Sequence, residues 1–223
     1  MKFYLVTKFK DQESLVASYL NKIGKVVPSL LECDLIVSVG GDGTLLTNGK
    51  IAIANDKPIV GINAGHLGYL CAFTLDNLPN LSLKDFEKLK ESKRTLLEYK
   101  DYVAINDICV LKENPAQSIE VDVESIASWK GDGVIVCTAT GSSAYNQAAG
   151  GPMIDKESTD IVVTPICPHF AEKGSEIIKD NQVIINVSNR KSAVLSVDNQ
   201  NLGHIEGRVV ITKSDKKLRL LTK

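Results

Sequence analysis

The sequence is poor in the features that mark membrane proteins and nucleic-acid-binding proteins. It has no apolar run close to the roughly 20 residues that a membrane helix needs, and aromatic residues make up only 5% of the chain. The 26 basic and 27 acidic side chains leave a net charge of −1, which argues against a chain that wraps nucleic acid. We therefore expect a soluble, cytoplasmic protein with neither a membrane nor a nucleic acid as its partner.

Cysteine and histidine lack the spacing of a metal site. The five cysteines are widely separated and form no CxxC pair, and the three histidines stand alone. Each cysteine lies in or beside an apolar stretch, so we expect reduced, buried thiols. No metal held by protein ligands alone is predicted.

The first 93 residues alternate between strand-like and helix-like stretches. Apolar runs at 3–7, 34–39 and 58–63 predict strands, and helices are expected at about 11–23 and from residue 44 onward. Strands that are continuously apolar and alternate with helices are typical of a parallel sheet covered on both faces.

The rest of the chain has a different character. A charged stretch at 84–93 predicts a connecting helix, and the short runs that follow are typical of an antiparallel β region. Strands are expected at 96–99, 102–105, 108–111, 118–123, 133–136, 161–164, 182–187, 193–197 and 209–212. The predicted fold class is thus an α/β N-terminal domain with a parallel sheet plus an all-β C-terminal domain. The expected bounds are 1–93 and 94–204, with a tail from about 205 to 223 that packs back on the first domain.

The first chemical motif is Gly40-Gly41-Asp42-Gly43-Thr44, between an apolar run and a predicted helix. Glycines let the backbone turn sharply and expose N–H groups, and a helix N-terminus adds partial positive charge, so this loop suits phosphate. A carboxylate repels phosphate, but Asp42 is explained if it accepts a hydroxyl proton or holds Mg²⁺ beside the phosphates. The alternative is a glycine-rich turn with a helix-capping aspartate. The motif is neither a P-loop nor GxGxxG.

A second motif spans residues 130–152, KGDGVIVCTATGSSAYNQAAGGP. It predicts a turn, a strand, a loop of small hydroxyl residues and a helix from Ser143 through Ala149. Small residues let a flat ligand approach, hydroxyls bind its polar edges, and Tyr145 can stack on a ring. The alternative is a tightly packed strand–loop–helix corner.

Two features are weaker. The Asn106-Asp107 pair between two predicted strands also suits a plain β-turn. The glycine-rich segment 61–68 follows a predicted strand, and loops at the carboxyl ends of strands border ligand crevices.

Together these segments resemble the NAD kinase family. GGDGT at 40–44, GINAGHLGYL at 61–70, ND at 106–107, the segment at 132–152 and SVDNQ at 196–200 follow that family's order and approximate spacing. The resemblance implies transfer of the γ-phosphoryl group of ATP, or of polyphosphate, to the 2′-hydroxyl of the adenosine ribose of NAD, which gives NADP. It also implies Mg²⁺ or another divalent cation as cofactor, close to Asp42. A homodimer or homotetramer is implied, with the NAD site near a subunit interface.

The resemblance also assigns roles to single positions. Asp42 is the implied catalytic proton acceptor, and the phosphate loop consists of Gly40, Gly41, Gly43 and Thr44. The implied NAD contacts are Gly43; Asn106 and Asp107 at the ribose; Lys130 and Asp132 on the nicotinamide side; Thr140; Ser143, Ala144, Tyr145, Asn146, Gln147 and Ala148 at the adenine; and Gln200. Asp107 stands where the family usually has a glutamate, which is one methylene longer.

Two other functions stay open on the sequence alone. A lipid kinase carries a similar GGDGT loop, but it needs an apolar cleft, and the hydroxyl-rich loop at 138–146 suits a polar nucleotide better. A non-catalytic dinucleotide-binding protein is the other alternative, although it would have no use for Asp42. We favour the NAD kinase.

Overall fold

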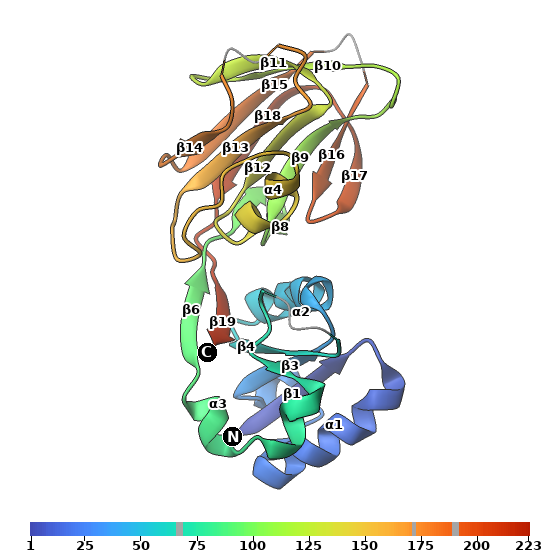
Figure 1. The fold of residues 1–223 in the computed structure, drawn as a ribbon, viewed down its shortest axis with the longest axis vertical. Helices are drawn as coiled ribbons and strands as arrows, with labels where there is room; N and C mark the ends of the chain where they lie inside the picture. Colours follow the sequence, from blue (N-terminus) through green and yellow to red (C-terminus); the bar gives the residue numbers. More distant parts are fainter. Residues whose placement is uncertain (66–68, 171–172, 189–191) are drawn as a thin grey trace. The chain divides into compact units, whose positions relative to one another are not determined.

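The computed structural model describes residues 1–65, 69–170, 173–188 and 192–223, and it divides into two compact units (Figure 1). Unit 1 consists of Met1–Lys93 and Lys217–Lys223, and unit 2 consists of Arg94–Lys216. The segment that returns to unit 1 therefore begins at Lys217, and residues 205–216 belong to unit 2.

Unit 1 is built on a mostly parallel sheet with the strand order β2-β1-β3-β4-β19-β6, and β5 pairs with β4. The pairs of β1 with β2 and β3, and of β4 with β3, β5 and β19, are parallel. The strands β3 and β4 are buried along their whole length, because both faces of the sheet are covered. The strand bounds are β1 (Lys2–Thr7), β2 (Lys25–Val26), β3 (Leu35–Val39), β4 (Ile59–Asn63), β5 (Phe73–Thr74), β6 (Lys90–Arg94) and β19 (Leu218–Thr222).

The two long helices of unit 1 lie on opposite faces of this sheet. Val16 and Leu20 of α1 share a core cluster with Val37 of β3, whereas Ser38, the next residue of β3, accepts a hydrogen bond from Asn48 of α2. Successive side chains of a strand point to opposite faces, so α1 and α2 cover one face each. The helical segments are α1 (Lys10–Ile23), η1 (Leu30–Glu32), α2 (Asp42–Ala54), η2 (Leu75–Asn80) and α3 (Leu83–Glu87).

The charged stretch at 84–93 is not one helix, as its composition predicted. The helix α3 ends at Glu87, and β6 begins at Lys90. Ser92 and Arg94 are buried while their neighbours Glu91 and Lys93 are exposed, which is the alternation of a strand with one covered face. Pairing within the sheet therefore overrides the helical composition of this segment.

Unit 2 contains two antiparallel sheets. One has the strand order β11-β10-β15-β18-β7-β8, and the other has the order β14-β13-β12-β9-β16-β17. The strands of the first sheet are β7 (Leu97–Tyr99), β8 (Tyr102–Ala104), β10 (Ile119–Val123), β11 (Ala127–Gly131), β15 (Gln182–Val187) and β18 (Gly207–Lys213). Those of the second sheet are β9 (Asp107–Lys112), β12 (Gly133–Cys137), β13 (Ile161–Ile166), β14 (Glu176–Ile178), β16 (Ala193–Val197) and β17 (Gln200–Ile205).

The core of unit 2 lies between its two sheets. Trp129 and Ile185 of the first sheet belong to the same buried cluster as Val110 and Val134 of the second sheet, so the sheets pack face to face as a sandwich. The outer face of the second sheet is covered in turn, because Cys109, Ile135 and Val162 contact Ala149 and Ile154 of the segment that follows β12. The predicted fold class is confirmed.

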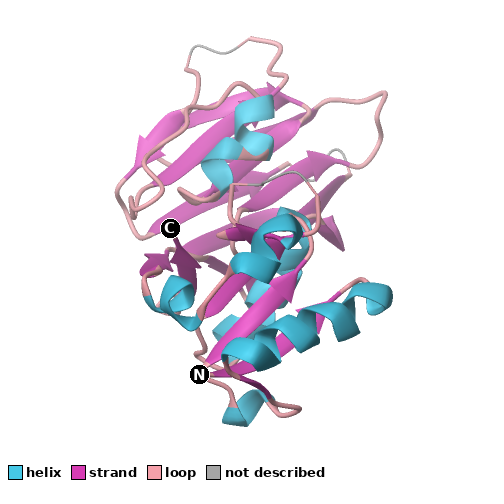
Figure 2. Ribbon diagram, turned by 60° about the horizontal axis from the view of Figure 1, so that its bottom comes forward, coloured by secondary structure: helices cyan, strands magenta, loops and turns pink. Residues whose placement is uncertain are grey.

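The segment over this outer face is less helical than expected. The predicted helix from Ser143 through Ala149 consists of a 3₁₀ turn, η3 (Gly141–Ser143), and a single helical turn, α4 (Tyr145–Ala148). Figure 2 shows unit 2 as an assembly of strands on which these are short helical pieces, in contrast to the long helices of unit 1.

The cysteines follow the expectation with one exception. Cys33, Cys71, Cys109 and Cys137 are free and buried, whereas Cys167 is free and exposed. Cys167 has a positive φ of 44° just after β13, where the chain leaves the sheet. Among the residues that the structure describes, no helix has the length and apolar character needed to cross a membrane.

Candidate functional site

The glycine-rich loop of unit 1 connects β3 to α2. Gly40 has a φ of 149°, and a Cβ there would lie 2.5 Å from the Thr44 hydroxyl oxygen, so only glycine fits this turn. Gly41 and Gly43 differ from it, because a Cβ on either would meet no atom of the described residues within 4 Å, apart from its chain neighbours and the helix backbone. The described part of the chain thus places no packing demand for glycine at these two positions, and the open space beside them suits a ligand that approaches the backbone.

The loop lies at the start of α2, where backbone N–H groups of the first turn have no partner within the helix. The helix begins at Asp42, two residues earlier than predicted, with Gly41 as its N-cap. The exposed glycines and the positive end of the helix dipole therefore suit an anion, as the sequence predicted for a phosphate.

Asp42 is held by the loop that follows β4. The backbone N–H of Tyr69 donates to Asp42 Oδ2 at 2.9 Å, and the N–H of Leu70 donates to Oδ1 at 3.2 Å. The Cys71 thiol lies 3.8 Å from Oδ1. A carboxylate has about four acceptor positions, so one direction stays open for a further donor such as a ligand hydroxyl. Asp42 forms no ion pair among the described residues.

Cys71 is a structural neighbour of this carboxylate. Burial raises the pKa of the Cys71 thiol to about 12, and the charge of Asp42 adds to the rise, so the thiol stays protonated and donates. Its sulfur also fills the space beside Gly61 of β4, where a Cβ would come within 2.7 Å of it. The predicted ligand-bordering segment 61–68 therefore includes one glycine needed for packing, while residues 66–68 lie outside the described part of the chain.

A hollow of about 300 Å³ adjoins the glycine loop within unit 1. It is lined by Thr7, Lys8, Gly43, Thr44, Thr47 and Asn48. Thr7, the last residue of β1, is paired in register with Val39, the last residue of β3, so the chain leaves both strands at the same sheet edge. Lys8 is exposed there, which places a cation in the wall of the hollow. Sequence reasoning missed Lys8, although its position directly after the first strand is a signal for this edge.

In unit 2 the Asn106-Asp107 pair lies at the start of β9. It is not a loose turn, because Asp107 is only 6% exposed and Thr138 N–H donates to the Asn106 carbonyl at 2.9 Å. The Cys109 thiol lies 3.4 Å from Asp107 Oδ1. The pKa of Asp107 is raised to about 6, chiefly by burial; the Cys109 hydrogen bond lowers it and the nearby Asp198 carboxylate raises it.

The hydroxyl-rich segment presents most of its predicted contact residues outward. Ala144, Tyr145, Gln147 and Ala148 are exposed and Ser143 is half-buried, while Thr140 is buried. Tyr145 is 40% exposed, so its ring has a free surface. Its pKa is raised, mainly by burial and to a smaller extent by Cys109, Cys167, Asp132 and Asp107.

Asn146 is the exception, because its side chain is turned into the fold; its contact with NAD stays a prediction. It is fully buried, and its amide donates to the carbonyl oxygens of Ser142 and Pro152 at 3.0 and 2.9 Å. Its oxygen accepts a hydrogen bond from Thr164 at 2.6 Å. Gly151 must be glycine because a Cβ there would lie 2.2 Å from that oxygen. Asn146 therefore locks the loop rather than facing a ligand.

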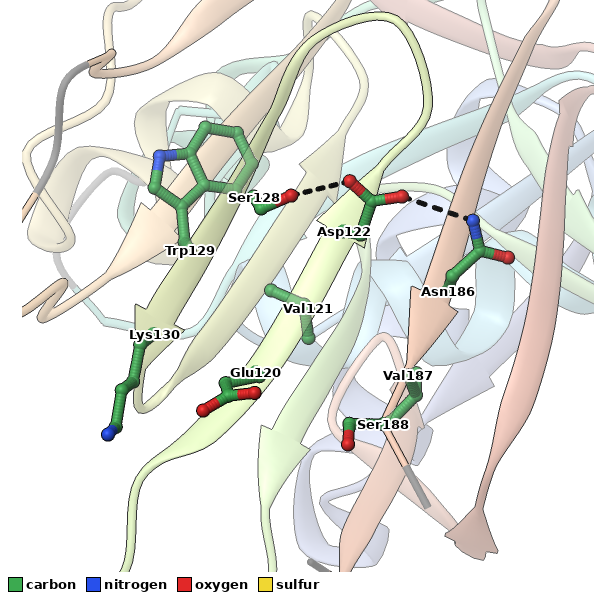
Figure 3. A pocket seen from close by; sticks show the side chains of 9 residues that line it. All are labelled: Glu120, Val121, Asp122, Ser128, Trp129, Lys130, Asn186, Val187 and Ser188. Carbon is green, nitrogen blue, oxygen red and sulfur yellow. Dashed lines mark hydrogen bonds between the residues drawn. The ribbon is translucent and has the colours of Figure 1, made fainter. Parts of the chain in front are cut away.

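Lys130 lies on β11, and Asp132 lies between β11 and β12. Asp132 precedes β12 and forms an ion pair of 2.7 Å with Lys112. Lys130 is on β11, beside Glu120 in the register of β10 and β11, and it lines an outer hollow of about 460 Å³. In Figure 3 its side chain extends beside Glu120, apart from the hydrogen-bonded Ser128, Asp122 and Asn186. These two residues were predicted together, but they occupy separate surroundings.

Gln200 begins β17 and is exposed. It follows the turn of Asp198 and Asn199, which both have positive φ values, 45° and 64°. The structure thus presents Gln200 at the tip of the β16–β17 hairpin, and the residue before the turn, Val197, is buried and pairs with it.

The chain offers little to bind a metal without substrates. No group of three or more His, Cys, Asp and Glu side chains that could hold an ion occurs among the described residues. The glycine loop supplies one carboxylate, Asp42, with an acceptor position open. This donor set fits Mg²⁺ held mainly by phosphates, since Mg²⁺ is commonly bound by one or two carboxylates plus substrate phosphates.

Both halves of the chain match known family profiles. Residues 11–88 match the ATP-NAD kinase N-terminal domain, and residues 104–222 match the ATP-NAD kinase C-terminal domain. The chain belongs to the NAD kinase family. The resemblance drawn from the motifs is thereby confirmed.

Curated NAD kinases of two bacteria illustrate the relationship. The NAD kinase of Chlorobium phaeobacteroides (strain DSM 266) is 37% identical over 187 residues, 78% of this chain and 65% of that protein. The NAD kinase of Sulfurimonas denitrificans is 34% identical over 189 residues, 78% of this chain and 66% of that protein. The chain thus spans slightly less than two thirds of the length of these NAD kinases.

Solved NAD kinases share the fold. The crystal structure of an NAD kinase from Archaeoglobus fulgidus in complex with ATP superposes with a TM-score of 0.82 at 26% identity, covering 100% of this chain and 94% of that chain. Yeast NADH kinase complexed with NADH gives a TM-score of 0.80 at 20% identity, covering 100% of this chain and 83% of that one. The second likeness shows the fold alone.

Proposed function

We propose that the protein is an NAD kinase that transfers the γ-phosphoryl group of ATP, or of polyphosphate, to the 2′-hydroxyl of the adenosine ribose of NAD. Family membership of both halves of the chain supports this activity. The observation that carries it is Asp42, a carboxylate fixed by two backbone N–H groups and flanked by two glycines with open space beside them.

Asp42 acts as the proton acceptor in this proposal. A ribose hydroxyl is a weak nucleophile, and a carboxylate within hydrogen-bond reach helps by taking its proton as the bond to phosphorus forms. The N–H donors of Tyr69 and Leu70 keep the Asp42 side chain in one orientation. Orientation matters here because phosphoryl transfer depends mainly on alignment and on electrostatic stabilisation.

The donor phosphates are proposed to lie at the glycine loop. Gly40 gives the turn, Gly41 and Gly43 leave the backbone accessible, and Thr44 adds a hydroxyl beside the hollow. Lys8 lines the same hollow and supplies the positive charge that a P-loop lysine supplies elsewhere. Mg²⁺ or another divalent cation would neutralise phosphate charge here, and the Asp42 carboxylate is the group of the loop that would hold it.

NAD is proposed to be bound by residues of unit 2 together with Gly43. Asn106 and Asp107 hold the ribose, and the outward-facing residues after β12 hold the adenine, with Tyr145 stacked on its ring. The further contacts are Thr140, Ser143, Ala144, Gln147, Ala148 and Gln200, with Lys130 and Asp132 on the nicotinamide side. The proposal includes a homodimer or homotetramer with the NAD site near the subunit interface, which sedimentation velocity tests directly.

One assay tests the proposed activity. Purified protein is incubated with NAD, ATP and Mg²⁺, and NADP is detected through an NADP-specific dehydrogenase. NADP formation supports the proposal. Tight NAD binding without turnover indicates a non-catalytic binder, and activity only toward lipid hydroxyls indicates a lipid kinase. Repeating the assay with polyphosphate, and with NADH, identifies the donor and the acceptor form.

A further inference from the structure

Asp198 ties the β16–β17 hairpin to the Asn106-Asp107 turn. Its Oδ2 accepts a hydrogen bond from the backbone N–H of Ile105 at 2.9 Å, and its Oδ1 accepts bonds from the N–H groups of Asn106 at 2.8 Å and Asp107 at 3.3 Å. In return, the N–H of Asp198 donates to the Asp107 carbonyl at 3.0 Å. One side chain therefore gathers three consecutive backbone donors across more than 90 residues of sequence.

The carbonyl groups of the same turn are held from the other side by Thr138. The Thr138 hydroxyl donates to the Ile105 carbonyl at 2.7 Å, and its N–H donates to the Asn106 carbonyl at 2.9 Å. The Thr138 hydroxyl also accepts the N–H of Gly141 at 3.1 Å. Gly141 packs so closely that a Cβ would lie 2.2 Å from the Asn106 carbonyl oxygen.

The backbone of residues 105–107 is thus fully engaged by Asp198 and Thr138. Only the side chains of Asn106 and Asp107 are left to act on a ligand. Because Thr138 also binds Gly141, the same contacts join this turn to the segment that carries Tyr145.

A carboxylate suits the position of Asp198 better than its amide. Both carboxylate oxygens are acceptors, whereas an asparagine offers one acceptor oxygen and directs an NH₂ group at an N–H. Asp198 and Asn199 both have positive φ values, as in a tight hairpin turn. This turn fixes the backbone of Asp198, so a substituted side chain cannot reach the three N–H groups through a shift of the backbone.

We propose that Asp198 is a positioning residue for NAD: it fixes the turn at 105–107 so that the Asn106 and Asp107 side chains meet the ribose in one geometry. The inference rests on the proposed NAD kinase function and deepens it. It predicts that Asp198 governs the NAD side of the reaction and leaves the donor side alone.

The test compares Asp198→Asn with Asp101→Asn, the same substitution at an exposed aspartate in the turn of the β7–β8 hairpin. Asp198→Asn is expected to raise the KM for NAD about tenfold, while the KM for ATP stays within about twofold. Asp101→Asn should change neither. Backbone amides of 105–107 should exchange hydrogen faster in the first variant only.

A second variant guards against a loss of folding. Thr138→Val removes the hydroxyl that holds the Ile105 carbonyl, and it should show the same selective rise in the KM for NAD, whereas Thr138→Ser should restore it. Equal changes in both KM values, or a lower melting temperature with both KM values unchanged, would overturn the inference.

The two levels of the proposal fail in different ways. If the unaltered protein neither binds nor phosphorylates NAD, the proposed function fails, and the inference fails with it. If the unaltered protein is active and the KM for NAD is the same in Asp198→Asn, only the inference fails.

Discussion

Two aspartates, one in each unit, accept hydrogen bonds from backbone N–H groups in a similar way, but their surroundings differ. Asp42 accepts two N–H groups of the loop after β4, and Asp198 accepts three N–H groups before β9. Asp42 is flanked by Gly41 and Gly43, where an added Cβ would meet no other side chain or distant backbone of the described residues within 4 Å. Asp198 belongs instead to the β16–β17 hairpin turn, and its hydrogen bonds join this turn to the buried start of β9.

The difference separates a residue that can act on a ligand from one that acts through its neighbours. Asp42 keeps an acceptor position toward open space, and its hydrogen bonds orient it. The three hydrogen bonds of Asp198 leave little capacity for a further donor, so its effect is transmitted through Asn106 and Asp107. Changes at the two carboxylates should therefore affect different kinetic constants.

The largest effect is expected for Asp42→Asn. The amide cannot accept a proton from the ribose hydroxyl, so kcat should fall by a factor on the order of 100 or more. NAD should still bind, as measured by titration calorimetry, because the residues of unit 2 are unchanged. A kcat close to that of the unaltered protein would remove Asp42 from the catalytic role and reduce it to a loop anchor.

A pair of glycine substitutions sharpens the comparison between open and packed backbone. Gly133 has a φ of 152°, and a Cβ there would lie 2.1 Å from the Val110 carbonyl oxygen, so Gly133→Ala should lower the free energy of unfolding by roughly 3 kcal/mol. Gly41→Ala should leave the free energy of unfolding nearly unchanged, since the added Cβ has no residue of the described ranges within 4 Å to push against.

The second member of the pair should instead affect activity. If phosphates approach the Gly41 backbone, the added methyl group should raise the KM for ATP about tenfold. Urea denaturation and steady-state kinetics on both variants measure the two effects. A destabilised Gly41→Ala, or an unaltered KM for ATP, would contradict this view of the loop.

The contrast also explains what the sequence could predict. The strand, the glycine loop and α2 follow one another within 20 residues, so apolar runs and glycines were enough to place Asp42. Asp198 and the turn at 105–107 lie more than 90 residues apart, and no local pattern announces their contact. The prediction of one helix at 84–93 was wrong for a related reason, because the burial of Ser92 and Arg94 in a sheet is a tertiary effect.

The hydroxyl-rich segment shows a finer limit. Its outward-facing residues could be predicted only in part from composition. The inward direction of Asn146 depends on Thr164 of β13 and on Pro152 in the following loop, which a local pattern does not show. The helix α4 has only one turn, which is too short for a hydrophobic periodicity to show which of its residues is buried. Lys8 is the opposite case, because its position directly after the first strand could be read from the sequence and yet was not used to predict it.

A third prediction concerns Asp107, the buried acid of unit 2. Its pKa is raised from 3.8 to about 6, so between these pH values the folded chain binds more protons than the unfolded chain. The free energy of unfolding should therefore fall as pH rises from about 4 to 6. Asp107→Asn removes this cost and should stabilise the protein by on the order of 2 kcal/mol at pH 7.

The same substitution should weaken NAD binding, since the ribose loses a charged acceptor. Urea denaturation at several pH values and the KM for NAD give the two readouts, with Asp101→Asn as the control. An Asp107→Asn protein that is less stable at pH 7 would show that the carboxylate stabilises the fold. An Asp107→Asn protein that keeps the pH dependence of the unaltered protein would show that another group titrates in this range.

The smallest effect is expected at Tyr145. Its ring is 40% exposed at the start of α4, so Tyr145→Ala should cost little stability and raise the KM for NAD roughly fivefold through lost stacking. Tyr145→Phe keeps the ring and should behave like the unaltered protein. If Tyr145→Phe is as impaired as Tyr145→Ala, the hydroxyl rather than the ring binds NAD. In that case the adenine side of the NAD site would depend on the polar hydroxyl group of Tyr145, much as the proposed catalysis depends on the carboxylate of Asp42.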